Sequence, residues 1–160
     1  MAAWEPNVRR DCETIRTSTS DMYRQVPDGH LADGEISLGG ICPTSREEYK
    51  LSVQCSDKVK SAKDATERHL ERQRQTNGCV TIAVDDVRRA VTEAQEAGHA
   101  SAELPIIDDS GCPDVPEEHV SIDFGANAPR PVRRALGQRL HKHVLERALS
   151  QDWAYKTPTA

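Results

Sequence analysis

The last quarter of the chain contains the pattern that most constrains its fold. Residues 119–124, His-Val-Ser-Ile-Asp-Phe, alternate polar and apolar side chains as a half-buried strand does. A Gly/Asn/Pro turn follows, and the pattern from about Arg130 to Ser150 predicts a long amphipathic helix. Pro131 suits the first turn of that helix, because its missing N–H would have no partner there. We therefore expect a strand covered by a long C-terminal helix.

The apolar side of this helix repeats every four residues. It consists of Val132, Leu136, Leu140, Val144 and Ala148, widened by Ala135, Leu145 and Leu149. On the strand, Val120, Ile122 and Phe124 share one face. We expect Ile122 and Phe124 to pack beneath Leu136 and Leu140, where each fully buried Leu contributes about 1.5–3 kcal/mol.

Periodicity and turn residues predict the other elements. Strands are expected at 35–41, 49–55, 79–84 and 104–107, and helices at 61–75 and 85–97. Strands interleaved with helices predict an α+β fold, with a small mixed sheet of three to five strands and helices mainly on one face. If the strands at 79–84 and 119–124 are parallel, the crossover between them is right-handed.

Length and composition predict one domain with a small core. The chain has 160 residues, of which 36% are hydrophobic and 4% aromatic. We expect residues 1–35 to form an irregular N-terminal arm or lead-in, and residues 36–155 to form a single α+β domain. Such lean apolar content predicts a modest core, or surface that becomes buried against a partner.

The cysteines predict reduced thiols. There are five, widely spaced and without a CxxC pair, which fits neither a disulfide framework nor a zinc finger. The N-terminus lacks the layout of a signal peptide, and no apolar run approaches membrane-spanning length. We therefore expect a cytoplasmic protein, with no cofactor, no metal and no membrane association.

Charge is unevenly distributed along the chain. The net charge is -5, but from Arg130 onward seven Lys and Arg face only Glu146 and Asp152. The tail therefore carries a surplus of five positive charges and the rest a surplus of ten negative ones. The residues that we expect to bind a partner or an anion are Arg133, Arg134, Arg139, Lys142 and Arg147. The alternative is an ordinary solvated face, paired with the protein's own acidic body.

His119 and Asp123 are candidates for acid–base chemistry. A carboxylate beside an imidazole could orient it for proton transfer. On a strand, however, an i, i+4 pair is separated by about 13 Å, so a third group would have to lie between them. The default interpretation is that His119, Ser121 and Asp123 are solvated residues on the outer face of the sheet.

The loop before this strand suggests two further sites. Cys112 lies in a Gly-Cys-Pro turn near His119, as a nucleophilic cysteine can, but nothing in the sequence fixes their geometry. The loop is also acidic and could hold a divalent cation. Its spacing matches neither an EF-hand nor HExxH, so solubilising charge is the favoured interpretation. The acidic residues are Asp108, Asp109, Asp114, Glu117 and Glu118.

Three short motifs in this order resemble a small family of uncharacterised bacterial cytoplasmic proteins. They are Tyr23-Arg24-Gln25-Val26-Pro27, Leu51-Ser52-Val53 and the stretch at 119–124, followed by the basic helix. The resemblance spans about residues 21–155. It implies a bacterial cytoplasmic origin and one continuous domain, and it supplies no catalytic or binding residue.

These observations favour a small bacterial interaction protein, an accessory, adaptor or immunity-type subunit that binds a larger protein partner. One alternative is a nucleic-acid-associated protein that uses the basic C-terminal helix, although few aromatic residues are available for base stacking. Another is an unrecognised hydrolase or metal-dependent enzyme with its site near residues 108–123. A deep polar pocket at His119 and Asp123 would favour the enzyme, and a flat apolar patch rimmed by charge the adaptor.

Overall fold

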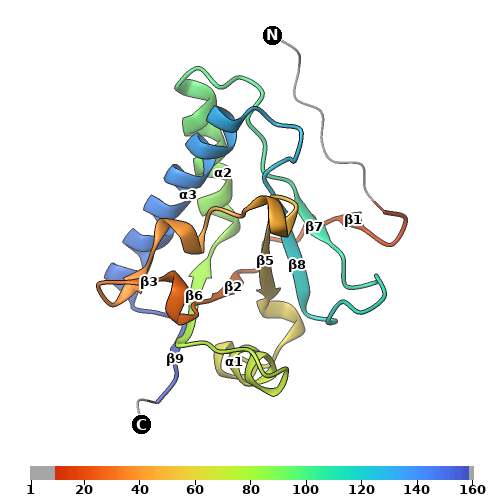
Figure 1. Ribbon diagram of the computed structural model, residues 1–160, viewed down its shortest axis with the longest axis vertical. Helices are drawn as coiled ribbons and strands as arrows, with labels where there is room; N and C mark the ends of the chain where they lie inside the picture. Colours follow the sequence, from red (N-terminus) through yellow and green to blue (C-terminus); the bar gives the residue numbers. More distant parts are fainter. Residues whose placement is uncertain (1–9, 159–160) are drawn as a thin grey trace.

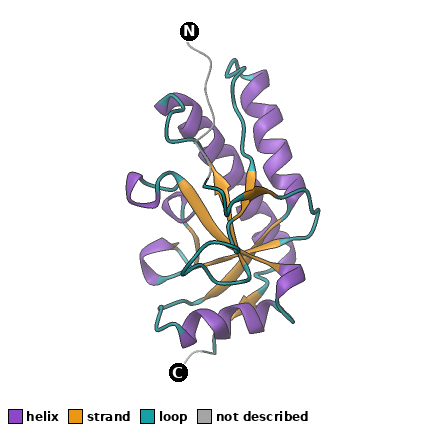
Figure 2. Ribbon diagram, turned by 90° about the vertical axis from the view of Figure 1, so that its right-hand side faces the viewer, coloured by secondary structure: helices purple, strands orange, loops and turns teal. Residues whose placement is uncertain are grey.

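The computed structural model describes residues 10–158, which form an α+β fold around one antiparallel sheet (Figure 1). Within that range the sheet has seven strands in the order β1-β7-β8-β5-β2-β6-β9. The strands are β1 (Thr14–Ile15), β2 (Met22–Gln25), β5 (Lys50–Cys55), β6 (Gly78–Ile82), β7 (Ile106–Asp108), β8 (His119–Asp123) and β9 (Tyr155–Lys156). The sheet is strongly twisted (Figure 2), as the chirality of its strands requires.

Two long helices cover one face of the sheet and a shorter helix covers part of the other. Helices α2 (Val84–Glu96) and α3 (Arg130–Gln151) lie side by side (Figure 1), whereas α1 (Ala62–Glu71) contacts β2, β6 and β9. The remaining elements are the hairpin of β3 (Leu31–Ala32) and β4 (Glu35–Ile36), and 3-10 turns at Asp28–His30, Leu38–Gly40, Ser45–Glu47 and Ser56–Lys58. None of the helices between residues 10 and 158 has the length and apolar character that crossing a bilayer requires.

The pairing of β5 with β8 separates an apolar face from a polar one. Leu51 pairs with Ile122 and Val53 with Val120, and all four side chains are buried in the core. The alternate pairs, Ser52 with Ser121 and Gln54 with His119, therefore point to the opposite face. The apolar pairs lie beneath α2 and α3, as the alternation in both segments predicted.

Helix α1 binds the polar face through hydrogen bonds. Gln25 donates to the side-chain oxygen of Gln54 at 2.8 Å, and Gln54 donates to the Ala65 carbonyl at 2.8 Å. The hydroxyl of Thr76 donates to Gln25 at 2.9 Å. Because these groups are buried, each hydrogen bond avoids the cost of an unsatisfied polar group. This network explains how a chain with few large apolar residues covers a second face of its sheet.

The helix starts follow local rules. The Ser61 hydroxyl accepts a hydrogen bond from the Asp64 backbone N–H at 3.1 Å and so caps α1 at the expected start of the helix. Helix α2 begins at Val84, one residue before its expected start, and no side chain caps it from Ala83. Asp86 lies in the first turn instead, where its carboxylate accepts from the Ala83 N–H at 3.0 Å and from Arg147 of α3.

The C-terminal prediction is confirmed. Strand β8 and helix α3 lie within one or two residues of their expected bounds, and Ile122, Phe124, Leu136 and Leu140 are each at most 1% exposed. Two residues of the predicted apolar stripe are exceptions: Leu145 is half-buried and Leu149 is 65% exposed. The apolar stripe of α3 is therefore narrower than the sequence pattern suggested.

Three predictions about the sheet are wrong. Over residues 10–158 it has seven strands rather than three to five, and every pair there is antiparallel, so the sheet is not mixed. Strands β6 and β8 are separated by β2 and β5 and run antiparallel, so the condition stated for a right-handed crossover does not apply. The segment 35–41 forms the short β4 and a 3-10 turn instead of a strand beside β5. Strand order depends on contacts between distant residues, which local periodicity does not encode.

The expected irregular arm at 1–35 is wrong where it includes β2, because Met22 to Gln25 lie between β5 and β6 near the centre of the sheet. Met22 and Val26 are completely buried. The segment is polar in sequence because Tyr23 and Gln25 face the hydrogen-bonded side of the sheet. The part of the prediction that falls on residues 1–9 lies outside the described residues.

Gly137 provides a test of the packing between α3 and the 3-10 turn at residues 38–40. A methyl group added at this position would collide with the Cys42 thiol. Exchanging Gly for Ala in a helix ordinarily stabilises it by about 1 kcal/mol. We expect Gly137→Ala to destabilise the protein instead, by about 1–3 kcal/mol in urea unfolding. The double variant Gly137→Ala/Cys42→Ala should recover most of the loss, and full stability of the single variant would contradict this packing.

Candidate functional site

A pocket on the polar face of the sheet brings together chemically active side chains. We call it the sheet-face pocket. It has a volume of about 280 Å³ and lies between the end of α1, strands β2 and β5, and the loop that precedes β8. Its walls include Tyr23, Arg24, Ser52, His69, Arg72 and His119. His119 was a predicted candidate, whereas the contributions of β2 and α1 were not anticipated.

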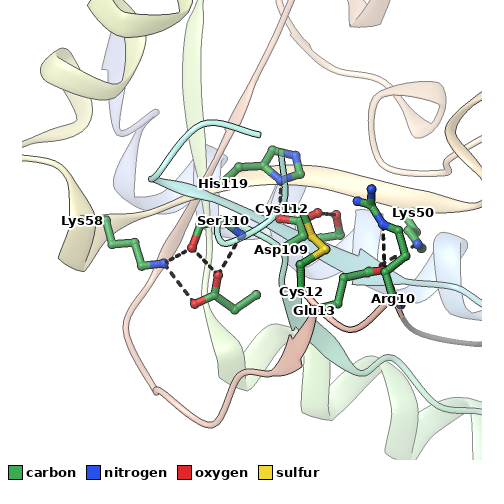
Figure 3. A network of polar contacts seen from close by, with 11 residues as sticks. Arg10, Cys12, Glu13, Lys50, Lys58, Asp109, Ser110, Cys112 and His119 are labelled. Atoms are coloured by element: carbon green, nitrogen blue, oxygen red, sulfur yellow. Dashed lines mark hydrogen bonds and ion pairs between the residues drawn. A yellow bond between two sulfur atoms is a disulfide. The ribbon is translucent and has the colours of Figure 1, made fainter. Parts of the chain in front are cut away.

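His119 is held by a buried carboxylate (Figure 3). Its Nδ1 lies 2.6 Å from Asp109 Oδ1, while Ser121 donates to Asp109 Oδ2 at 2.8 Å. Because an ionised carboxylate only accepts, the Nδ1 atom carries the proton in this contact. The other ring nitrogen, Nε2, points away from Asp109 (Figure 3). The third group that the His119/Asp123 hypothesis required is therefore Asp109, and it replaces Asp123 as the partner of the imidazole.

Asp123 lies at the other end of β8 and does not line the pocket. It is buried, and its carboxylate accepts a hydrogen bond from the Gly125 N–H at 2.8 Å. Ser121 is likewise 2% exposed. The interpretation of this face as solvated is therefore wrong for Ser121 and Asp123. Asp109 of the loop at 108–118 contacts Ser121, whereas Asp123 binds the turn that follows β8.

A disulfide joins Cys12 to Cys112 (Figure 3). The expectation of reduced thiols is wrong for this pair, although Cys42, Cys55 and Cys79 are free. The Cys112 sulfur is already bonded, so it offers no thiolate as a nucleophile in this state. The bond ties the loop that carries Asp109 to the segment before β1. Disulfides are commonest in oxidising compartments, and a cytoplasmic location stays a prediction.

Ion pairs fix the same loop to the body of the protein (Figure 3). Lys58 donates to Asp108 at 3.0 Å and to Ser110 at 2.9 Å. Burial raises the pKa of Asp108, but hydrogen bonds from Ser110 and Lys58 outweigh it and lower the pKa to about 2. Across residues 10–158, no group of three His, Cys, Asp or Glu side chains is placed to hold a metal ion. The carboxylates of Asp108 and Asp109 serve to position the loop.

Glu118 is clamped by Arg68 of α1 and by Arg72, the residue that follows this helix. Its side chain is completely buried, accepts a hydrogen bond from Arg72, and lies 3.5 Å from Arg68 Nη1. Burial raises the pKa of Glu118, yet hydrogen bonding and the positive charges of Arg72 and Arg68 reduce it below the ordinary value of 4.5. The clamp docks the end of this loop against α1 and so fixes one wall of the pocket.

The predicted basic residues of α3 divide into two groups. Arg147 makes a bidentate pair with the buried Asp86, with distances of 2.9 and 2.8 Å. Arg133 donates to the Ala128 carbonyl and lies 3.9 Å from the centre of the Tyr49 ring. The side chains of these two arginines therefore stabilise the fold instead of facing a partner. Arg139 bonds to a carbonyl of its own helix, and Arg134 and Lys142 are exposed.

A shallow groove lies on the opposite face of the sheet, along α2. We call it the α2 groove. Its volume is about 500 Å³, and its floor consists of Val87, Val91, Leu104 and Pro105. Exposed Arg88, Thr92 and Glu103 form the rim. Among the described residues, neither Arg88 nor Glu103 takes part in an ion pair. Sequence periodicity placed Val87 and Val91 on the inner stripe of α2, but it could not show that a groove remains beside them.

Comparison of the chain with protein-family models, with curated proteins and with solved structures gives no match. The resemblance to a family of uncharacterised bacterial proteins therefore stays a prediction.

The Glu118 clamp generates a stability prediction. We expect Glu118→Gln to lower the free energy of unfolding by about 1.5–3 kcal/mol, because a charged hydrogen-bond acceptor is lost. Glu117→Gln is the matched control. Glu117 also pairs with Arg68, but its side chain is 79% exposed, so we expect a loss below about 0.5 kcal/mol. Urea midpoints at pH 7 measure both, and equal losses would contradict the clamp.

The same clamp predicts how stability depends on pH. Because the folded pKa of Glu118 is lowered, its contribution is complete well above 4.5 and disappears as the pH falls through the folded value. The difference in unfolding free energy between the wild type and Glu118→Gln should therefore shrink below pH 4.5. A difference that stays constant from pH 7 to pH 3 would show that the carboxylate is not stabilised by its charge.

Proposed function

We propose that this chain is an interaction protein that binds a larger protein partner through the α2 groove. The observation that supports the proposal is the apolar floor of this groove, together with two rim charges that form no ion pair within the described residues. Val87 and Leu104 are 3% and 6% exposed, so the floor of the groove is part of the hydrophobic core. Anchors of protein interfaces commonly fill such depressions, with polar groups around them.

The rim indicates the chemistry of the partner. Arg88 contributes a positive charge on the helix side, and Glu103 a negative charge on the side of the extended segment. A partner segment with an apolar side chain between an acidic and a basic residue would match both rims. Such charges favour specificity and the rate of association more than affinity. The apolar anchor therefore supplies most of the binding energy, and the rim selects the partner and its orientation.

The small core fits this proposal. Only 4% of the residues are aromatic, and α1 is held by polar networks, so the protein has little apolar material apart from the layer beneath α2 and α3. The groove is where that layer approaches the surface. Burial of partner atoms there would extend the existing core without exposing new polar groups.

Nucleic-acid binding by α3 is the less favoured function. Arg147 and Arg133 are held by Asp86 and by backbone carbonyls, which removes two of the five cations from an outward-facing surface. The exposed Arg134 and Lys142 remain, with acidic Glu146 on the same helix. Two exposed cations beside an acidic residue supply little of the positive charge that binding to a phosphate backbone requires.

Charge reversal at the rim tests the proposal. The bait is the full chain, and binding to its purified partner is measured by calorimetry after a pull-down from the source organism's extract. We expect Arg88→Glu to weaken the partner complex about tenfold, equivalent to about 1.4 kcal/mol. Val91→Thr should weaken it too, because a hydroxyl enters the apolar floor.

Lys142→Glu is the matched control, since it reverses an exposed charge on the neighbouring helix. We expect this variant to retain the complex. Loss of binding in Lys142→Glu with retention in Arg88→Glu would assign the interface to the basic face of α3 and overturn the α2 groove. Failure of the wild type to bind any protein stoichiometrically would reject the interaction function itself.

A further inference from the structure

We propose that the sheet-face pocket is a binding site for a small molecule that bears an oxyanion, a phosphate or a carboxylate group. The pocket lies on the opposite face of the sheet from the α2 groove, so this inference does not depend on the protein partner. Arg24 supplies the fixed positive charge, and the rest of the pocket supplies hydrogen-bonding groups suited to oxygen atoms.

Arg24 is anchored without being neutralised. Strands β2 and β5 pair only at Met22–Cys55 and Tyr23–Gln54. Beyond these pairs the guanidinium of Arg24 bridges the strands, and it donates from Nη1 to the Ser52 carbonyl and from Nε to the Gly40 carbonyl, both at 2.9 Å. These acceptors are uncharged, and Arg24 forms no ion pair with the described carboxylates. Nη2 also lies 3.5 Å from His30 Nδ1, so one N–H of each terminal nitrogen is left for a ligand.

Neighbouring arginines strengthen the positive field. Arg72 and Arg74 also line the pocket. Arg72 is neutralised by Glu118, whereas Arg74 is exposed and lacks an ion pair in the described part of the chain. His69 lies among them, and burial together with the charges of Arg74, Arg24 and Arg72 lowers its pKa to about 4. The imidazole is therefore neutral at pH 7, so it adds no further charge.

Two polar groups complete the arrangement. With the proton on Nδ1 bound to Asp109, the Nε2 atom of His119 is a hydrogen-bond acceptor on the pocket side. Tyr23 contributes a hydroxyl whose pKa is raised by burial and then by the nearby Cys79 and Asp21, so it stays protonated and can donate. A cation with two N–H groups to spare and a phenol match the acceptor oxygens of an oxyanion, while the imidazole nitrogen matches a hydroxyl of the ligand, such as that of hydrogen phosphate.

The size of the pocket limits the ligand. A volume of about 280 Å³ is at the lower end for small-molecule sites. It accommodates the oxyanion and a small organic group, but not a nucleotide. Glu118 already shows how this region binds a carboxylate, because Arg72 and Arg68 hold its oxygens beside the same cavity. An external anion would use the remaining cations, Arg24 and Arg74.

Titration with simple anions tests the site. Inorganic phosphate, acetate and succinate are added separately to the full-length protein at low ionic strength, and binding is followed by calorimetry and by amide NMR shifts. Sodium chloride at equal ionic strength is the reference. We expect saturable millimolar or tighter binding of phosphate or of a carboxylate, with shifts at Tyr23, Ser52 and His119. The relative affinities distinguish phosphate from carboxylate ligands.

Variants make the test specific. Arg24→Gln should reduce anion affinity at least tenfold, but it also removes a bridge between strands. Arg74→Gln avoids that problem, because its side chain is exposed and unpaired, and it should weaken binding severalfold with unchanged stability. Arg134→Gln, on the other face, is the control and should bind normally. An absence of saturable binding, or equal losses in Arg74→Gln and Arg134→Gln, would overturn the proposal.

Discussion

The register between β5 and β8 is the constraint on which the rest of this structure depends. Five consecutive pairs join the strands, from Lys50–Asp123 to Gln54–His119. Since side chains alternate, this single alignment places Leu51 and Ile122 toward α2 and α3, and Ser52 and His119 toward the pocket. A slip of one residue would exchange the two faces and bury the polar set in the core. The apolar packing beneath α3 therefore also determines which residues are available for chemistry.

The two faces of the sheet are stabilised by different interactions. One is a layer of aliphatic side chains, whereas the other depends on the glutamine network under α1, the Glu118 clamp, the Asp109 contacts and the disulfide. Buried polar networks are stabilising only when all of their members have partners. This requirement gives the polar face a definite geometry. It also explains how a chain with a single phenylalanine can form an ordered seven-stranded sheet.

The sequence predicted the elements whose signals are local. Alternation identified β5 and β8, the four-residue repeat identified α3, and Ser61 marked the start of α1. It did not predict β2, whose Gln25 looks like a loop residue until Gln54 of β5 and Thr66 of α1 provide its partners. Asp109 was grouped with solubilising acids because its contact with His119 depends on the path of a loop. Cys12 and Cys112 are separated by 100 positions, and no local pattern links cysteines that distant.

The same contrast separates the two proposed surfaces. The α2 groove is formed by a helix and a short segment that pack on the aliphatic layer, so its shape follows from the core and should persist wherever the protein is folded. The sheet-face pocket has one wall that is held by the Cys12–Cys112 bond and by ion pairs. Reduction of the disulfide would release the loop that carries Asp109 from the N-terminal segment, while Lys58 and the arginine clamp would still hold it. Reducing conditions should therefore affect the pocket before the groove, because the disulfide holds the loop beside the pocket and none of the residues that line the groove.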